Sequence, residues 1–280
     1  MKKIISAILI CLMLACCLCS CDLSDITGGA TRLSYKSVDG GVAVTKVPDH
    51  SSMPEIVIPD EYEGERVVAI SDFAAVNLEN VTKITIGKYV RDIGLWALEN
   101  NKHLTAIEVD DENGYFCDKD GVLYSKDMKT LLFYPPARGI TEMTDADGNT
   151  VTGIAYTIPE GVETIRTKAF YKCSDIREIT LPAGLKAIEE KAFFRCSISE
   201  VTLPDTLEVI GKDAFTYCSG LKKITIPASV TQIGDYAFYN CTSLLEINVG
   251  SPENELTLGE KWYPTNNGLN IDGLTINFAE

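Results

Sequence analysis

The chain has 280 residues, 45% hydrophobic and 23% charged, an ordinary globular composition that allows one large domain or two small ones. Its 40 acidic and 25 basic residues give a formal net charge of −15, which excludes nucleic acid as the expected partner because phosphate neutralisation needs basic residues. With only two histidines, catalysis built on histidine is hard to assemble.

The chain begins with an export signal rather than with part of the fold. A basic start precedes a short apolar stretch over 4–19, which is too short and wrongly flanked for a comfortable membrane span. The stretch Leu18–Cys21 at its end resembles the bacterial lipobox, in which the cysteine receives lipid and becomes the new N-terminus. We therefore expect lipid attachment at Cys21, with Cys16 as the runner-up. An ordinary cleaved signal with incidental cysteines is the alternative.

A β-hairpin is predicted over Leu33–Val47, because strand-like alternation surrounds the turn residues Asp39-Gly40-Gly41. Two weak copies of a repeated pattern follow, at Val57–Ile84 and Thr85–Ile107. A hairpin before a repeat array is the kind of atypical unit that covers the open end of its core.

The repeated pattern stops between residues 110 and 156. Alternating residues at Val122–Ser125 and Lys129–Tyr134 predict a β-hairpin inserted on the rim of the array. The stretch Thr144–Thr150 predicts a second tight turn. A calcium loop is the alternative there, but its glycine stands at the fourth position whereas an EF-hand needs glycine at the sixth.

Four regular repeats follow, with the shared pattern T-[IL]-P-x-x-[VL]-x-x-I-x-x-x-A-F-x-x-C-[ST]. They are 23, 22, 23 and 23 residues long and span Thr157–Ile179, Thr180–Val201, Thr202–Ile224 and Thr225–Ile247. Each repeat is too small to bury its apolar face alone, so stacking the repeats is expected to build one continuous core.

The pattern within a repeat predicts a short strand and a turn. In Leu221–Pro227, Ile224 and Ile226 point inward and Lys223 and Thr225 point outward, because side chains alternate along a strand, and the proline ends the strand. The Ala-Phe pair is expected in a short helical or 3-10 stretch. Its phenylalanines would fill the space between coils: Phe170, Phe193, Phe215 and Phe238.

One cysteine recurs in each regular repeat, and Asn101 stands at the same place in an earlier copy. The recurring residues are Cys173, Cys196, Cys218 and Cys241. A ladder of buried free thiols is the leading interpretation, since free cysteine is among the most buried residue types. Disulfides are the alternative, because coils about 4.8 Å apart lie within bonding range, but parallel stacked side chains are poorly oriented for them. A zinc site is not favoured, because these recurring cysteines form no C-x2-C pair. Cys117, outside the repeats, is either a free thiol or a strand residue facing the core.

These residues resemble the BspA-like bacterial leucine-rich repeats, whose pattern is matched nearly letter for letter over Ile226–Ile247. The resemblance implies a repeat solenoid, a right-handed superhelix of short parallel β-strands with short helical or 3-10 turns, an inserted β-hairpin and β-rich terminal caps. It also implies a surface or secreted protein of a bacterium that lives with an animal host, in some members an adhesin for host matrix proteins. It supplies no catalytic residues.

The predicted organisation has five parts. They are a lipoprotein signal peptide at 1–20, an anchor and tether at 21–32, an N-terminal cap at 33–56, the repeat domain at 57–250 with its insertion at 110–156, and a C-terminal cap at 251–280.

The outward strand positions form the candidate binding face. They are Glu178, Thr180, Glu200, Thr202, Lys223, Thr225 and Glu246. Solenoids commonly bind ligands on such extended faces, although threonine also favours exposed strand positions for local reasons. A second row, Tyr171, Phe194 and Tyr239 with Tyr217 one place later, serves either a partner or packing along the coil edge.

We found no phosphate loop, nucleophile elbow or metal triad in the sequence, so we expect no enzyme, cofactor or metal. The predicted function is that of an exported, lipid-anchored protein at the cell surface, which binds a protein or glycan ligand without catalysis, like an adhesin. Neither nucleic acid nor a small-molecule substrate is expected, and the membrane is contacted only through the anchor. A scaffold that holds another protein of the bacterial envelope is the alternative.

Overall fold

The computed structural model describes residues 33–48, 53–144, 148–266 and 269–280. The description concerns the unit Leu33–Glu280. The predicted signal peptide, the tether and the lipid-attachment residues Cys21 and Cys16 lie outside the described residues.

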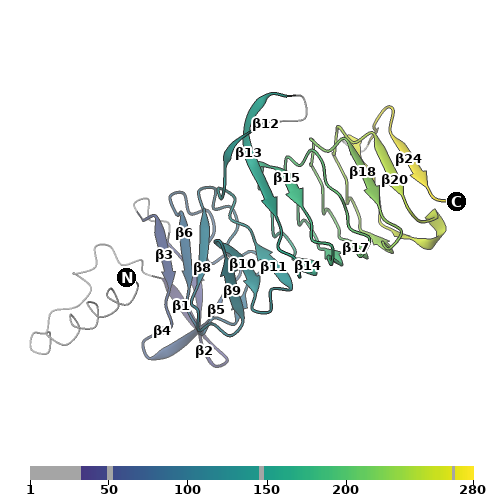
Figure 1. The fold of residues 1–280 in the computed structure, drawn as a ribbon. Helices are drawn as coiled ribbons and strands as arrows, with labels where there is room; N and C mark the ends of the chain where they lie inside the picture. Colours follow the sequence, from purple (N-terminus) through teal and green to yellow (C-terminus); the bar gives the residue numbers. More distant parts are fainter. Residues whose placement is uncertain (1–32, 49–52, 145–147, 267–268) are drawn as a thin grey trace, which may run out of the picture. The chain divides into compact units, whose positions relative to one another are not determined.

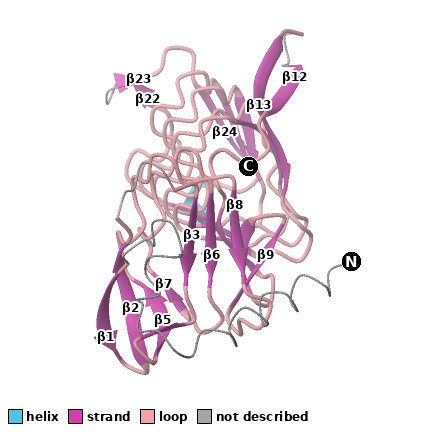
Figure 2. Ribbon diagram, turned by 90° about the vertical axis from the view of Figure 1, so that its left-hand side faces the viewer, coloured by secondary structure: helices cyan, strands magenta, loops and turns pink. Residues whose placement is uncertain are grey.

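The unit Leu33–Glu280 is a β-solenoid, and its main row of parallel strands occupies equivalent places in successive repeats (Figure 1). Figure 2 shows the first three of these strands side by side. In chain order the row contains β3 (Glu55–Ile58), β6 (Lys83–Ile86), β8 (Ala106–Val109), β13 (Thr150–Thr157), β15 (Ile176–Thr180), β18 (Lys223–Ile226), β20 (Glu246–Val249) and β24 (Thr275–Phe278).

A second row of parallel strands is shorter, mostly two residues per coil. It contains β5 (Glu65–Ile70) and β7 (Asp92–Ile93), then β11 (Thr130–Phe133), β14 (Thr164–Ile165), β16 (Ala187–Ile188), β17 (Val209–Ile210), β19 (Gln232–Ile233) and β21 (Thr257–Leu258). The predicted fold class, a leucine-rich-repeat solenoid of short parallel strands, is therefore confirmed. The alternation in β18 is also as predicted, with Ile224 and Ile226 buried and Lys223 and Thr225 exposed.

The core lies between the two rows of strands. The four repeated phenylalanines are completely buried and stack on one another, with ring centroids 5.0, 5.2 and 5.3 Å apart along the series. Two buried apolar clusters share the unit, and they meet at β10 (Val122–Ser125), where Leu123 belongs to one and Val122 and Tyr124 to the other.

The expected helical or 3-10 stretch around each Ala-Phe pair is wrong, because these residues form successive turns. In the first regular repeat, the Ala169 N–H bonds to the Arg166 carbonyl and the Cys173 N–H bonds to the Phe170 carbonyl. Lys168 and Lys172 have φ values of 62° and 60°, and a left-handed residue stops a helix from propagating. Among the described residues the only helix is η2 (Glu253–Glu255), and no helix is long and apolar enough to cross a membrane.

The interruption of the repeat is built into the stack rather than placed on its rim, which corrects the expected position. β9 (Phe116–Lys119), β10 and β11 form antiparallel pairs, and β11 then pairs in parallel with β14. Tyr134, which follows β11, is completely buried and stacks on Phe170 at 5.0 Å. This segment takes the place of a coil because its apolar side chains complete the same core.

A second hairpin extends from the main row (Figure 1). β12 (Thr141–Thr144) pairs antiparallel with β13, and Thr144 lies opposite Thr150. The predicted tight turn, and the alternative calcium loop, depend on residues 145–147, which lie outside the described residues. β13 also pairs in parallel with β15, so β12 forms the edge of the sheet β12-β13-β15.

The two ends of the unit extend the strand rows. β1 (Ser34–Val38) and β2 (Gly41–Lys46) form the predicted antiparallel hairpin, β2 pairs in parallel with β5, and β4 (Glu61–Tyr62) pairs antiparallel with β5. At the other end, β21 and β24 continue both rows although the repeat sequence is lost. β22 (Thr265–Asn266) and β23 (Leu269–Asn270) form a separate antiparallel pair. Trp262 covers the phenylalanine stack, its ring centroid 6.5 Å from that of Phe238.

Candidate binding groove on the strand face

The second regular repeat is one residue short, and the missing residue can be located. In the third regular repeat, Cys218, Leu221 and Ile224 are buried at intervals of three residues. In the second repeat, Cys196 and Ile198 are buried two residues apart and Val201 comes three residues later. The deletion therefore falls between the cysteine and the next core residue, where other repeats form a turn.

The short repeat interrupts the main row of strands. Among the described residues, β15 and β18 belong to different sheets, and the second repeat contributes no named strand to the main row between them. Glu178 and Glu200 form an isolated parallel bridge, and the ladder does not continue from Glu200 to Lys223. We attribute this break to the one residue that the second repeat lacks after Cys196.

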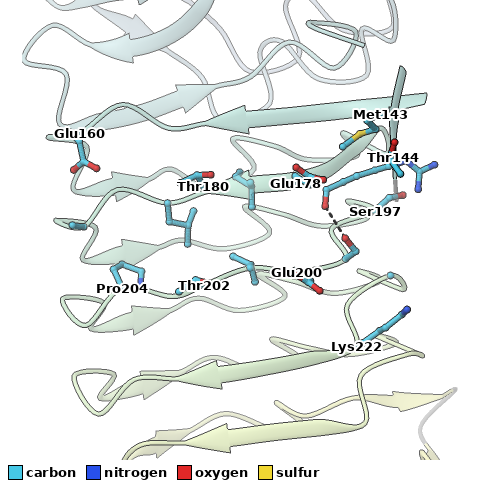
Figure 3. Close-up of a pocket in the computed structure, with 17 residues that line it drawn as sticks. Met143, Thr144, Glu160, Glu178, Thr180, Ser197, Glu200, Thr202, Pro204 and Lys222 are labelled. Atoms are coloured by element: carbon cyan, nitrogen blue, oxygen red, sulfur yellow. Dashed lines mark hydrogen bonds between the residues drawn. The ribbon is translucent and has the colours of Figure 1, made fainter. Parts of the chain in front are cut away.

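A groove of about 820 Å³ lies at this interruption (Figure 3). Ile179 and Val201 are buried beneath it, while Met143 and Thr144 of β12 form one wall. An adjoining groove of about 480 Å³ shares Glu200 and continues toward β18. The two form one continuous surface, which we call the strand-face groove.

Polar contacts fix the backbone around the strand-face groove. Arg177 donates from Nε to the Thr152 carbonyl at 2.8 Å, which links the groove to the hairpin strand β13. The Ser199 hydroxyl lies 3.4 Å from the Arg177 carbonyl, and the Ser199 N–H bonds to the same carbonyl at 3.1 Å. The groove therefore combines an apolar floor with hydroxyl, carboxylate and basic groups held by the coils.

Six of the seven predicted binding residues line the strand-face groove. Glu178, Thr180, Glu200 and Thr202 lie in its larger part, and Lys223 and Thr225 in the adjoining part. Glu246 is not among the lining residues. It forms an ion pair with Lys223 at 2.6 Å, and that contact, followed by one with Asn248, lowers the pKa of the Glu246 carboxyl.

Sequence reasoning missed several lining residues, namely Met143, Thr144, Arg177, Ser197, Ser199 and Lys222. The hairpin residues carry no signal of their own, because their position depends on the pairing of β13 with β15. The count of 22 residues in the second repeat was the available signal for the interruption.

The cysteines do not belong to this groove. Each repeated thiol is completely or almost completely buried and donates to the carbonyl of the core residue one coil earlier, for example from Cys218 to Phe193 at 3.1 Å and from Cys241 to Phe215 at 3.0 Å. Asn101 bonds to the Ala75 carbonyl in the same way. All the cysteines in the described residues are free, and burial raises the pKa of Cys218 to about 12. Protonated, buried thiols are structural rather than reactive.

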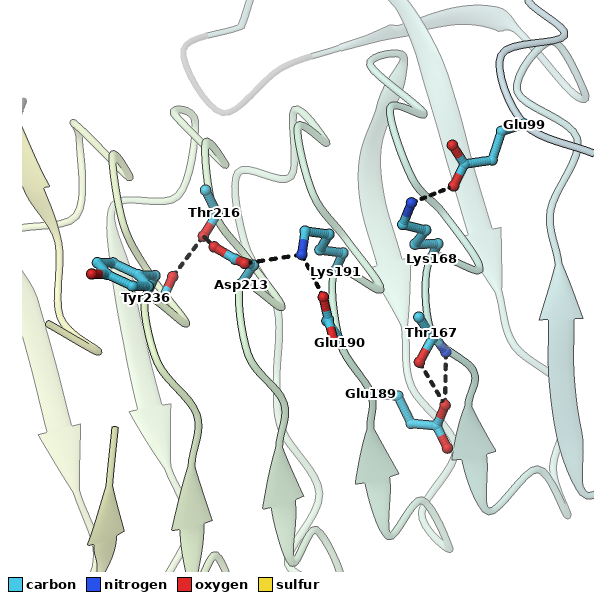
Figure 4. A network of polar contacts seen from close by, with 9 residues as sticks. All are labelled: Glu99, Thr167, Lys168, Glu189, Glu190, Lys191, Asp213, Thr216 and Tyr236. Carbon is cyan, nitrogen blue, oxygen red and sulfur yellow. Dashed lines mark hydrogen bonds and ion pairs between the residues drawn. The ribbon is translucent and has the colours of Figure 1, made fainter. Parts of the chain in front are cut away.

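A polar network crosses the coils elsewhere (Figure 4). The Lys168 ammonium is buried and lies 2.7 Å from the Glu99 carboxylate, and desolvation lowers its pKa. Glu189 accepts from the Thr167 N–H at 2.8 Å, whereas Glu190 pairs with Lys191. The carboxylates of Glu189 and Glu190, which are adjacent in the sequence, thus contact different partners. Within the described residues, no group of three or more metal-ligating side chains occurs.

Comparison with known families decides the identity of the repeat. The profile of the family described as "BspA type Leucine rich repeat region" matches six copies, over residues 49–125 and 150–267, which is more than half of the chain. The chain belongs to the BspA-type leucine-rich repeat family.

A solved structure with a TM-score above 0.5 shows the same fold for this BspA-type protein. The pneumococcal vaccine antigen PcpA superposes with a TM-score of 0.63 and 23% identity, over 81% of our chain and 57% of that chain. A leucine-rich cell surface protein of Faecalibacterium prausnitzii gives a TM-score of 0.43 and 21% identity, over 91% and 78% of the two chains. A search of curated proteins found no match.

Proposed function

We propose that this BspA-type protein is displayed on the bacterial surface by a lipid anchor and binds a macromolecular ligand, without catalysis, in the strand-face groove. Family membership supports a role in protein interaction. The observation that carries the proposal is the coincidence of three features: the shortened repeat, the break in the main row of strands, and a hairpin wall beside that break.

The composition of the strand-face groove favours a protein ligand. Apolar side chains such as Val201 and Leu203 lie under a surface of threonine, serine and charged groups, as in the apolar centre and polar rim of protein interfaces. Glu178 and Glu200 stand on adjacent coils, so two carboxylates of like charge are held close together. Basic groups on a ligand would relieve their repulsion.

The experiment is a binding measurement with purified fibronectin, collagen and laminin, at low and at physiological salt. We expect saturable binding of at least one of them, and a loss of about tenfold or more in the double variant Glu178→Lys, Glu200→Lys, because a charge reversal in an interface changes attraction to repulsion. The matched control is Glu253→Lys, Glu255→Lys, which makes the same change of charge on exposed residues outside the groove.

Equal loss in both double variants would overturn the groove as the binding surface. Uniform absence of binding to host proteins would instead favour the envelope scaffold, which predicts co-purification of one bacterial envelope protein in stoichiometric amount.

A further inference from the structure

A row of aromatic side chains crosses the coils beside the Ala-Phe place: Phe73, Trp96 and Tyr236 directly precede its alanine, and the other members follow its phenylalanine. We call it the aromatic stripe, and it consists of Phe73, Trp96, Tyr171, Phe194, Tyr217, Tyr236 and Tyr239. Ring centroids are 5.6 Å apart between Phe73 and Trp96, and 5.0 Å apart between Tyr171 and Phe194. Separations of 5.6, 6.1 and 5.7 Å continue the stripe through Tyr217 and Tyr239 to Tyr236.

One buried cation joins the two halves of the aromatic stripe. Lys168 lies over the ring of Trp96 and 4.8 Å from the centre of the Tyr171 ring, and its charge is already paired with Glu99. The stripe therefore has no gap between the weak early repeats and the regular ones. Its rings remain partly open to solvent, with Phe73 59% and Tyr217 39% exposed.

Two exposed cations flank the stripe without a carboxylate partner. Lys172 lies 5.1 Å from the Tyr171 ring centre, and Arg195 lies 5.6 and 5.0 Å from the ring centres of Phe194 and Tyr217. Among the described residues, neither forms a salt bridge, whereas nearby Lys191 pairs with Glu190 and Asp213. Unpaired cations on a chain of net charge −15 are a local exception that an anionic ligand would complement.

The backbone N–H groups of three residues in this surface already donate hydrogen bonds within the protein. Lys172 donates to the Phe194 carbonyl, Arg195 to the Thr216 carbonyl and Tyr217 to the Tyr239 carbonyl, at 2.8, 2.9 and 2.8 Å. A peptide that binds by adding a strand needs such groups, so this surface does not offer that mode of recognition. What it offers is side chains only, namely aromatic rings and cations spaced one coil apart.

We propose that the aromatic stripe is a second binding surface, whose ligand is an acidic polysaccharide lying across the coils. Its carboxylate or sulfate groups would pair with Lys172 and Arg195, as guanidinium and ammonium groups commonly pair with oxyanions. Its sugar rings would pack on the exposed parts of Phe73, Phe194 and Tyr217. This surface shares no lining residue with the strand-face groove, so it goes beyond the function proposed above.

The test measures binding of the full-length protein to heparin, hyaluronate, neutral dextran and poly-glutamate at several salt concentrations. We expect binding to heparin or hyaluronate that weakens with salt, and none to dextran. The double variant Lys172→Ala, Arg195→Ala should lose about tenfold or more in affinity. The control Lys36→Ala, Lys119→Ala removes the same charge from exposed residues outside the stripe and should bind like the parent protein.

A second pair of variants tests the rings. Tyr217→Leu should weaken polysaccharide binding severalfold, and Tyr115→Leu, at a tyrosine 53% exposed outside the stripe, should not. Equal losses in stripe and control variants, or poly-glutamate binding as tight as polysaccharide binding, would overturn the proposal. The variant Glu178→Lys, Glu200→Lys should keep its polysaccharide binding, so failure of the groove and failure of the stripe are distinguishable.

Discussion

At the residue scale, the repeated cysteine and Asn101 perform the same task. A carbonyl from the preceding coil turns into the core, and a side-chain donor must meet it because an unpaired buried carbonyl is costly. Cys196 donates to the Phe170 carbonyl at 3.2 Å and Asn101 to the Ala75 carbonyl at 2.8 Å. The alignment of Asn101 with the cysteines was therefore sufficient to predict an inward polar contact rather than metal binding.

Because their thiols are buried, the repeated cysteines should make the free energy of unfolding fall as the pH rises above 9. Burial raises the pKa of Cys218 from 9.0 to about 12, so between these values the unfolded thiol loses its proton while the folded thiol keeps it. The Cys218 contribution is complete below pH 9 and is lost as pH rises toward 12, at up to about 1.4 kcal/mol per pH unit. Urea unfolding between pH 8 and 10.5 should show a shallower decline in Cys218→Ala.

Leu221→Ala is the control for the thiol prediction. This variant also truncates a completely buried side chain of the same repeat, but leucine has no ionisable group. The free energy of unfolding of Leu221→Ala should therefore change with pH as it does in the parent protein. A Cys218→Ala slope equal to that of Leu221→Ala would contradict the thiol explanation.

A glycine directly follows the second-row strands β17 and β19, at Gly211 and Gly234, where the backbones of neighbouring coils approach closely. A Cβ on Gly234 would lie 2.4 Å from the Lys212 nitrogen, a contact with backbone that only a shift of the coil relieves. We expect Gly234→Ala to lower the free energy of unfolding by about 1–3 kcal/mol, as overpacking does. Gly184→Ala should be neutral or stabilising by up to about 1 kcal/mol, since nothing lies within 4 Å of its Cβ position. Equal unfolding midpoints in urea for the two variants would refute this reason for the glycine.

At the element scale, the strands of the main row were predictable, whereas the two-residue strands of the second row and the turns were not. Alternating apolar residues and the following proline fix short strands such as β18, because only one register buries Ile224 and Ile226. The turns depend on left-handed residues such as Lys172 and Arg195, with φ near 60°. Lysine and arginine carry no preference for that conformation, so the sequence gives no local sign of it.

The interrupted region shows a second limit of prediction from sequence. Its strands β10 and β11 were expected, but their burial in the stack follows from contacts made far along the chain, such as Tyr134 on Phe170. Six of the seven residues predicted on the strand face line the groove, but the groove itself was not predicted, because it lies at a repeat that lacks one residue. Its hairpin wall required knowledge of the pairing between β13 and β15.

At the scale of the whole molecule, the predicted membrane anchor and the proposed binding surfaces belong to separate parts of the chain. The predicted anchor lies in Met1–Arg32, and the groove and stripe lie in Leu33–Glu280. We expect Cys21→Ala to move the protein from the membrane fraction to the soluble fraction, because a lipid-modified cysteine supplies the attachment. Cys16→Ala should remain with the membranes. Membrane retention of Cys21→Ala together with release of Cys16→Ala would place the lipid on Cys16 instead.

The proposed binding function rests on the groove at the shortened repeat. Inserting one glycine between Ser197 and Ile198 restores 23 residues and gives Cys-Ser-Gly-Ile, which has the spacing of the Cys-Ser-Gly-Leu sequence at Cys218–Leu221. The repaired repeat should extend the main row of strands across the gap and close the groove. A glycine inserted beside Gly64, where nothing lies within 4 Å of its Cβ position, is the control.

The most direct measurement compares the affinity of these two insertion variants and the parent protein for the matrix protein that the parent binds. We predict that the Ser197–Ile198 insertion folds with at least the parent's unfolding midpoint and loses binding by about tenfold or more, while the control binds normally. Full binding by a stably folded Ser197–Ile198 insertion would contradict the groove as the functional site.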